Sequence, residues 1–83
     1  MKVTVRYFAS IREAIGQGSE AVETSASTLG ALRDELIARG GAHAASLARG
    51  KAVRMALDQT LSDEGAVLAD GAEVAFFPPV TGG

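Results

Sequence analysis

The chain of 83 residues carries a net charge of −2 and has no cysteine. This length fits one domain with a modest core, so a deep catalytic cavity with a full set of surrounding side chains is hard to accommodate. The missing thiols exclude disulfides, cysteine-ligated metals, iron–sulfur clusters and cysteine nucleophiles. The dispersed lysines and arginines argue against nucleic acid as a partner.

Membrane and export signals are not expected in this sequence. No apolar run approaches the roughly 20 residues that a membrane helix needs. The first residues lack the long apolar stretch and cleavage site of a signal peptide. We therefore expect a cytoplasmic protein without a membrane partner.

The first residues alternate between apolar and polar side chains, which predicts a half-buried strand. Phe8 would then lie on the polar face of that strand. Residues 10–15 are consistent with a helical turn, and residues 20–24 with an edge strand paired to the first. The side chains expected to face the core are Val3, Val5 and Tyr7.

A main helix is predicted to begin after Thr28, a good N-cap residue. Glu35 and Arg39 lie four residues apart, which favours an ion pair on its exposed side. Gly40 follows and is typical of a helix end. Residues 42–48 are consistent with a further helical turn around a buried leucine, Leu47. The apolar stripe of the main helix consists of Leu29, Leu32, Leu36 and Ile37.

The second half of the chain predicts two more strands, over residues 54–57 and 72–77. Asp58-Gln59 turns the chain after the first of them, and Asp70-Gly71 precedes the second. The first and last strands have the strongest apolar faces, so we expect them to be central neighbours with the main helix across them. The prediction is an α+β domain with a mixed sheet of four to five strands and one main helix on one face.

The sequence ends in an unusual combination of residues. Pro78 and Pro79 cannot continue a central strand, because neither has an N–H to donate, and they favour a stiff exit. Gly82 and Gly83 have no side chains and would let an arm enter a narrow channel and present an unhindered carboxylate. Most chain ends are simply frayed, and it is the combination that indicates an arm. We expect a domain over residues 1–78 and a flexible tail over residues 79–83.

A carboxylate at Gly83 would need activation before it could accept a nucleophile. The chain has no phosphate-binding glycine motif of its own, so a separate ATP-using enzyme would form the acyl-adenylate.

Four segments resemble one known family, the small subunits of molybdopterin synthase among the ubiquitin-like, ThiS-type sulfur carriers. The most specific is the octet from Phe76 to Gly83. The others are Tyr7-Phe8-Ala9 followed by Ile11-Arg12-Glu13, Thr28-Leu29 with Ala31-Leu32-Arg33, and Asp70-Gly71 followed by Glu73-Val74-Ala75. About half of the chain takes part. Family members often have asparagine where this chain has Asp58, which leaves the role of that loop open.

The resemblance implies a β-grasp fold and a sulfur-carrier function. A ubiquitin-activating-enzyme-like adenylyltransferase would adenylate Gly83, and a sulfur donor protein would supply the sulfur of a C-terminal thiocarboxylate. The tail would enter the large subunit, with which a heterotetramer is expected, and sulfur would pass to a pterin precursor to build the dithiolene of the molybdenum cofactor. ATP would be used by the activating enzyme, and no cofactor or metal would be held permanently by this chain.

The resemblance also assigns roles to individual residues. Gly83 would carry the adenylate and the thiocarboxylate, and Gly82 would give clearance. Three exposed side chains would dock on a partner, although aromatic residues on strands are more often simply packed: Phe8, Leu61 and Phe77. The inserted arm would consist of Pro78, Pro79, Val80 and Thr81.

Other functions stay open at this point. The chain could carry sulfur for thiazole or thionucleoside synthesis, or be a protein modifier joined to lysines through Gly83. It could also be a plain binding module with an inert tail. In the leading interpretation it is a non-catalytic, sulfur-donating subunit of a heteromeric sulfurtransferase. The single histidine, His43, has no metal-ligand spacing or triad partners and is interpreted as incidental.

Overall fold

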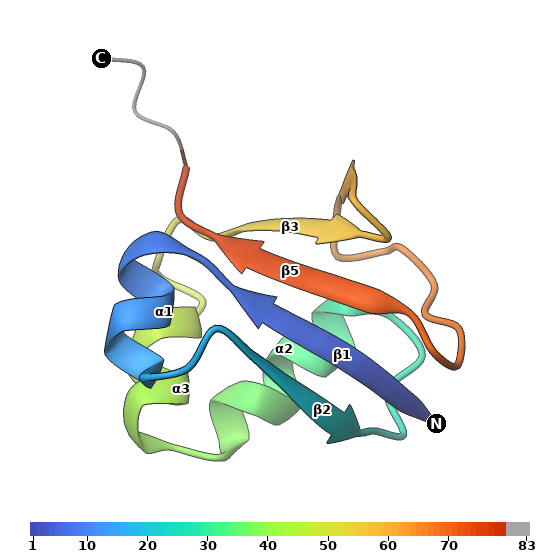
Figure 1. Ribbon diagram of the computed structural model, residues 1–83, viewed down its shortest axis with the longest axis horizontal. Coiled ribbons are helices and arrows are strands. Elements are labelled where there is room, and N and C mark those ends of the chain that lie inside the picture. Colours follow the sequence, from blue (N-terminus) through green and yellow to red (C-terminus); the bar gives the residue numbers. More distant parts are fainter. Residues whose placement is uncertain (80–83) are drawn as a thin grey trace.

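The computed structural model of the chain describes residues 1–79 (Figure 1). Within these residues, three helices and five strands follow one another. In order they are β1 (Lys2–Tyr7), α1 (Ala9–Ile15), β2 (Ser19–Glu23), α2 (Leu29–Ala38), α3 (Gly41–Leu47), β3 (Arg54–Leu57), β4 (Thr60–Ser62) and β5 (Glu73–Phe77).

The five strands form one mixed sheet in the order β2-β1-β5-β3-β4. The central pair, β1 and β5, is parallel, and the other three pairs are antiparallel. The first and last strands are therefore central neighbours, as the sequence predicted. Together with the helix packed across one face, this order is the ubiquitin-like β-grasp arrangement.

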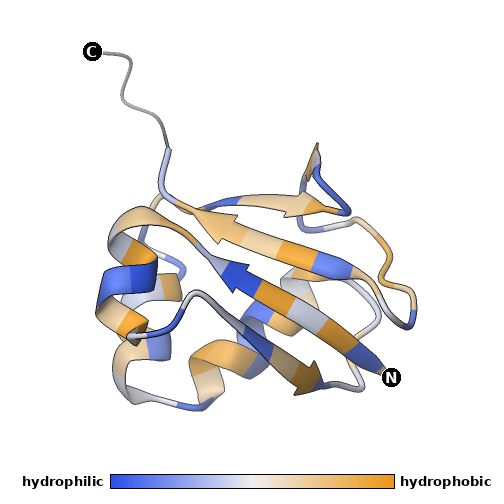
Figure 2. Ribbon diagram, in the orientation of Figure 1, coloured by the Kyte–Doolittle hydropathy of each residue, from blue (hydrophilic) through white to orange (hydrophobic). Residues whose placement is uncertain are grey.

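The helices cover only one face of the sheet. In Figure 1 α2 lies behind the strands, and α3 lies behind and below α1, against which it packs, at the end where β5 leaves the sheet. The alternation of β1 is visible as bands of blue and orange in Figure 2. Its inward side chains are at most 1% exposed and join the leucines of α2 in the core, whose largest fully buried side chains are Tyr7, Phe76, Leu29, Leu32, Leu36, Leu47, Val3, Val5 and Val74.

The start of α2 agrees with the sequence prediction. The Thr28 side chain accepts a hydrogen bond from the backbone N–H of Ala31 at 3.2 Å, as an N-cap does. The helix ends at Ala38, and Gly40 then adopts a φ of +76° that L side chains rarely tolerate. This glycine lets α3 begin at once in a new direction.

One predicted contact is wrong. Glu35 and Arg39 do not pair along α2. Instead Glu35 accepts a hydrogen bond from the Thr24 hydroxyl at 2.6 Å, and Arg39 pairs with Glu20 at 2.8 Å. Both side chains have stronger partners at the edge strand β2, so the exposed helical pair, worth only about 0.3–0.5 kcal/mol, does not form.

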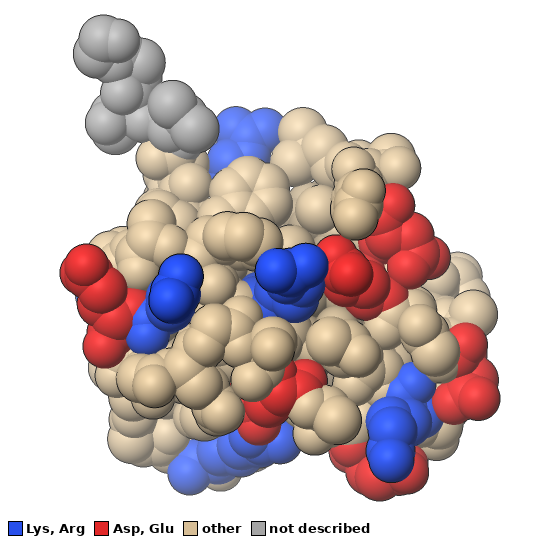
Figure 3. All heavy atoms as spheres, viewed as in Figure 1, with Lys and Arg blue, Asp and Glu red and all other residues tan. Residues whose placement is uncertain are grey.

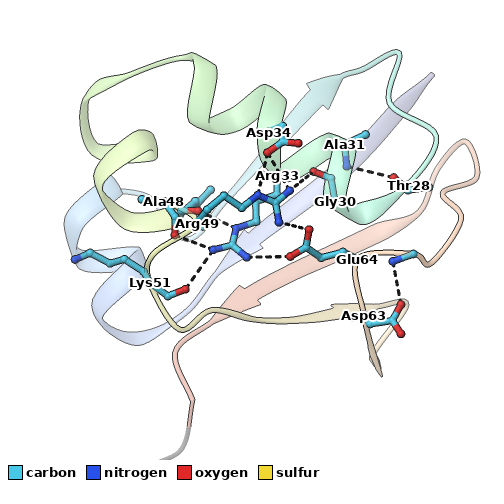
Figure 4. A network of polar contacts seen from close by, with 12 residues as sticks. Thr28, Gly30, Ala31, Arg33, Asp34, Ala48, Arg49, Lys51, Asp63 and Glu64 are labelled. Carbon is cyan, nitrogen blue, oxygen red and sulfur yellow. Dashed lines mark hydrogen bonds and ion pairs between the residues drawn. The ribbon is translucent and has the colours of Figure 1, made fainter.

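A buried arginine of α2 connects this helix to the segments that follow α3 and β4 (Figure 4). Arg33 of α2 has only 5% of its side chain exposed, and it donates hydrogen bonds to the carbonyls of Leu47 at 2.8 Å and Ala48 at 2.9 Å. Its guanidinium also contacts the Glu64 carboxylate at 3.4 Å. Burying this charge is tolerable because it is paired and hydrogen-bonded. The interaction fixes the segments that lead into β3 and β5.

Candidate functional site

The sheet face that carries no helix presents apolar side chains in two rows. Strand register places Ala75 of β5 opposite Ala56 of β3 and Arg6 of β1, and places Leu61 of β4 opposite Ala56. Opposed residues of neighbouring strands share a face, so these four residues form one row across the sheet. In the next row Phe77 lies opposite Arg54.

A shallow hollow of about 660 Å³ occupies this face. Phe8, which follows β1, and Phe77 of β5 both line this hollow. Phe8 is 42% exposed and Leu61 is 58% exposed, although both are large apolar side chains. Leu61 lies outside the hollow and extends the apolar row beyond Ala56. We call the following set the open apolar face: Phe8, Ala56, Leu61, Ala75, Phe77, Pro78 and Pro79.

The chain leaves the sheet at the border of this face. Pro78 and Pro79 are half-buried and line the hollow directly after the end of β5. Their place agrees with the prediction that the two prolines end the strand and begin an exit. The remaining tail residues predicted as functional, Val80, Thr81, Gly82 and Gly83, lie outside the described residues.

Positive charge borders the open apolar face. The Arg6 guanidinium lies 5.7 Å from the centre of the Phe8 ring, close enough for a cation–π contact, and 3.8 Å from the Glu73 carboxylate. Arg54 is exposed beside Phe77. Figure 3 looks onto this side of the sheet and shows an uncharged area between blue atoms at the upper margin and blue atoms near the middle.

The loop whose role the sequence left open has a defined structural contact. Asp58 and Gln59 form the two-residue turn between β3 and β4, with φ values of +50° and +69°. The Asp58 carboxylate accepts the backbone N–H of Glu73 at 2.9 Å, and the Asp58 N–H donates to the Glu73 carbonyl at 2.8 Å. An asparagine side-chain oxygen could accept the same bond, so aspartate preserves this anchor of β5.

A polar cluster on the covered side was not predicted. Glu20 of β2 accepts hydrogen bonds from the Tyr7 hydroxyl at 2.7 Å and from Arg39 at 2.8 Å, and it lies 2.9 Å from Nε2 of His43. His43 also packs edge-on against Tyr7, with ring centres 5.9 Å apart. The histidine therefore joins α3 to the sheet. No sequence signal could have shown this, because its members come from four separate segments.

The contacts in this cluster shift the pKa values of Glu20 and Tyr7. Burial opposes the charged form of Glu20, but the hydrogen bonds from Arg39, His43 and Tyr7 outweigh it and lower the pKa of Glu20 from 4.5 to about 2. Burial, together with the hydrogen bond to Glu20, raises the pKa of Tyr7. The carboxylate thus stays ionised and the phenol stays protonated near neutral pH, which keeps the hydrogen bond between them in place.

Two other features, a metal-binding cluster and a membrane-spanning helix, are absent from residues 1–79. Among residues 1–79, no group of three or more His, Cys, Asp and Glu side chains could hold a metal ion. Within the same part of the chain, no helix is long and apolar enough to cross a membrane.

The structure brings most of the predicted docking residues together. Phe8, Phe77, Pro78 and Pro79 come together around one hollow, and Leu61 lies on the same face. Neither flanking arginine was predicted to belong to this surface: pairing of Arg6 with an acidic partner was a possibility from the sequence, but simple solvation was the preferred interpretation, and Arg54 was not assigned a role. The alternation of β1 had put Arg6 on the same side as Phe8, which was the available signal.

Comparison with known proteins identifies relatives over nearly the whole chain. The molybdopterin synthase sulfur carrier subunit of Escherichia coli (strain K12) is 42% identical over 81 residues, which cover 98% of this chain and 99% of that protein. The protein of the same name from Haemophilus influenzae is 40% identical with the same coverage. A solved complex of subunits 1 and 2 of molybdopterin-converting factor from Helicobacter pylori 26695 contains a chain that is 29% identical, with a TM-score of 0.69 and 100% of both chains covered.

The family match is equally extensive. Residues 5–83 match the model of the ThiS family. The resemblance predicted from the four sequence segments is confirmed, and this chain belongs to the ThiS family.

Proposed function

We propose that this protein is the sulfur-carrier subunit of a molybdopterin synthase. The observation that carries the proposal is the open apolar face, which continues without a break into the two prolines from which the tail departs. A surface of this kind has no use in folding and is suited to a partner. The near full-length similarity to two sulfur carrier subunits of this enzyme supports the same function.

In the proposed reaction the carboxylate of Gly83 attacks the α-phosphorus of ATP on a separate adenylyltransferase, and pyrophosphate leaves. A sulfur donor protein supplies sulfur at the oxidation level of sulfide, whose attack forms the acyl C–S bond and releases AMP and a proton. The product is a thiocarboxylate at Gly83. The absence of cysteine is compatible with this chemistry, because the sulfur is held at the chain end.

The large subunit of the synthase would receive the carrier. Phe8, Leu61 and Phe77 would pack against it, and Pro78 and Pro79 would direct the tail toward its active site. The thiocarboxylate sulfur then attacks a carbon of the pterin precursor, so that a C–S bond forms as the bond from that carbon to an oxygen substituent breaks and the oxygen group leaves with a proton. Water cleaves the acyl–sulfur bond, which returns the carboxylate of Gly83 and leaves the sulfur on the precursor.

The chain is in this proposal a sulfur-donating subunit that holds no cofactor permanently. The partner would supply the catalytic residues, and Gly82 and the arm of Val80 and Thr81 would supply reach and clearance. We expect a heterotetramer of two carriers and two large subunits in the cytoplasm. The relative from Helicobacter pylori was solved as a complex of two subunits, which supports an assembly of this type.

The direct test uses the missing cysteine. The protein is incubated with ATP, a sulfur donor and an extract of its source cells, then treated with a thiol-alkylating reagent and digested. An alkyl adduct on the peptide that contains Gly83 is expected, because no side-chain thiol exists to give one. A variant that lacks Gly83 serves as the control and should give no adduct and no sulfur transfer while keeping its fold.

Other results would favour the other functions. Conjugates between Gly83 and lysines of other proteins, with the activating enzyme present, would support a protein modifier. An adduct at Gly83 without transfer to the pterin precursor would support a sulfur carrier for thiazole or thionucleoside synthesis. Neither product would indicate an inert tail.

A further inference from the structure

Two arginines lie on the open side of the sheet, and neither donates a side-chain hydrogen bond to another of residues 1–79. Arg6 projects from the central strand β1 in the row of Ala75, and Arg54 projects from β3 opposite Phe77. Arg6 has 46% of its side chain exposed, and Arg54 is also exposed. They bracket the apolar centre of the face from two sides.

Both guanidinium groups have hydrogen-bonding capacity to spare. Arg6 contacts Glu73 only at 3.8 Å, beyond hydrogen-bond distance. Within residues 1–79, Arg54 makes no ion pair and no side-chain hydrogen bond. An arginine has five N–H donors, and none of those on Arg6 or Arg54 takes part in a side-chain hydrogen bond with the described residues.

Three of the four other arginines behave differently, while the fourth, Arg12 of α1, is exposed and makes no ion pair or side-chain hydrogen bond within residues 1–79. Arg39 lies 2.8 Å from Glu20, and Arg49 lies 2.9 Å from Asp34, in each case within hydrogen-bond distance of a carboxylate. Buried Arg33 contacts a carboxylate and three backbone carbonyls. Acidic side chains of the same domain thus pair with these three arginines. Arg6 and Arg54, beside the open apolar face, keep N–H donors that a partner protein can use.

We propose that Arg6 and Arg54 select a large subunit whose docking surface has an apolar centre flanked by two carboxylates. This inference rests on the proposed function, since it specifies the chemistry of the partner at the same face. Docking excludes water from the apolar centre, so a guanidinium left unpaired at its margin would lose hydration without replacement. A carboxylate opposite each arginine supplies that replacement and can do so through two parallel hydrogen bonds.

The sheet geometry gives the expected spacing of the two carboxylates. Arg6 and Arg54 are separated by two strand spacings of about 4.8 Å and by two residues of about 3.3 Å each along the strands. Their Cα atoms are therefore roughly 12 Å apart. A partner with acidic residues at that separation gains affinity for this chain. A partner with lysine or arginine at the same positions is repelled by like charge.

Charge at the margin of an interface acts mainly on the association rate and on partner choice. The test is therefore kinetic. Association with the large subunit from the same organism is measured by stopped-flow at low and at high salt for the wild type, Arg54→Glu and Arg6→Gln. Glutamine is used at position 6 because glutamate there would face Glu73.

A matched control is available on the same sheet. Lys2 is exposed and lies four residues before Arg6 on β1, roughly 13 Å away. Lys2→Glu changes the net charge as much as Arg54→Glu does but leaves the margin of the apolar face intact. Phe77→Ala reports docking itself, and thermal melting of every variant separates binding from folding.

The expected result is a loss of about tenfold in association rate at low salt for Arg54→Glu, and a smaller loss for Arg6→Gln. The difference from wild type should shrink at high salt, where charges are screened, and Lys2→Glu should stay within about twofold of wild type. Equal rates for Arg54→Glu and Lys2→Glu would overturn the inference, while a loss with Phe77→Ala would leave the docking proposal standing. No binding by the wild type would overturn both.

Discussion

The two faces of the sheet are both apolar, but only one of them stabilises the fold. On the covered face Phe76 of β5 is fully buried, and Leu36 of α2, which belongs to the same core, is 1% exposed. On the open face Leu61 and Phe8 are 58% and 42% exposed. Burying such a side chain is worth about 1.5–3 kcal/mol, and on the open face much of that free energy is not realised until a partner covers it. The comparison shows which apolar residues serve folding and which are available for binding.

The charged residues divide in the same way. Arg33 is enclosed by three carbonyls and a carboxylate, whereas Arg54 has no ion pair or side-chain hydrogen bond within the part of the chain that the structure describes. The same residue type is a structural cross-link on one side and a free donor on the other.

The largest effect is expected from a matched pair of leucine truncations. Leu36→Ala removes fully buried methyl groups and should lower the free energy of unfolding by about 2–5 kcal/mol, because a cavity is left in the core. Leu61→Ala should lower it by less than about 0.5 kcal/mol but weaken association with the large subunit. Urea unfolding followed by circular dichroism measures the first quantity, and titration calorimetry measures the second.

Each of these two variants is the control for the other, because one should mainly change stability and the other should mainly change binding. If Leu61→Ala destabilised the isolated domain as much as Leu36→Ala, the open face would be part of the folding core. The distinction between the two faces would then be lost.

The next effect concerns the buried arginine. Arg33→Met keeps much of the side-chain volume but leaves the carbonyls of Leu47 and Ala48 without their donor. Buried acceptors without partners are costly, so the free energy of unfolding should fall by about 2–4 kcal/mol. Arg54→Met is the control and should melt within a few degrees of wild type. Equal melting temperatures for the two variants would show that the Arg33 contacts contribute nothing.

A smaller effect is expected from the Glu20 cluster as the pH falls. The folded-state pKa of Glu20 is lowered to about 2 from 4.5, so between these values the unfolded chain binds more protons than the folded one. The stabilisation from this group is complete above pH 4.5 and is lost as the pH falls toward 2. Allowing for solvent screening, the loss should be about 1–2 kcal/mol.

The measurement is the urea midpoint between pH 6 and pH 2.5. Glu20→Gln should show a flatter dependence on pH than wild type, since the shifted carboxylate is gone. Glu13→Gln, at an exposed position of α1, is the matched control and should follow the wild-type curve. Identical slopes for the Glu20 variant and wild type would contradict the shift.

Local sequence rules predicted most of the fold. The cap at Thr28, the stripe of α2, the turn at Asp70-Gly71 and the central placement of β1 and β5 all follow from short-range patterns. The three-residue strand β4 had not been assigned as a separate element, because it is too short to show an alternating pattern. The Glu35–Arg39 pair was predicted wrongly, because packing of α2 against β2 offered each residue a better partner.

The candidate site was predictable only in part. A period of two placed Phe8 and Phe77 on the non-core side of their strands, but the register that brings Arg54 opposite Phe77 requires the folded sheet. The cluster around Glu20 likewise depends on tertiary packing of separate elements. The proposed role of Gly83 came from the family resemblance and lies outside the described residues.

The smallest effect is a gain in stability at the edge of the open face. Gln59 has a φ of +69° in the two-residue turn between β3 and β4 and also lines the apolar hollow. Glycine adopts positive φ without steric cost, and turns of this type favour it. Gln59→Gly should therefore raise the free energy of unfolding by about 0.5–1 kcal/mol, measured as a higher urea midpoint. If the urea midpoint rises while association with the large subunit weakens, Gln59 lowers the stability of the domain and contributes to binding. That result would agree with a role of the open face in binding and not in folding. An unchanged midpoint would show that the turn relaxes around glutamine, and Gln59 would then give no support to a strained binding edge.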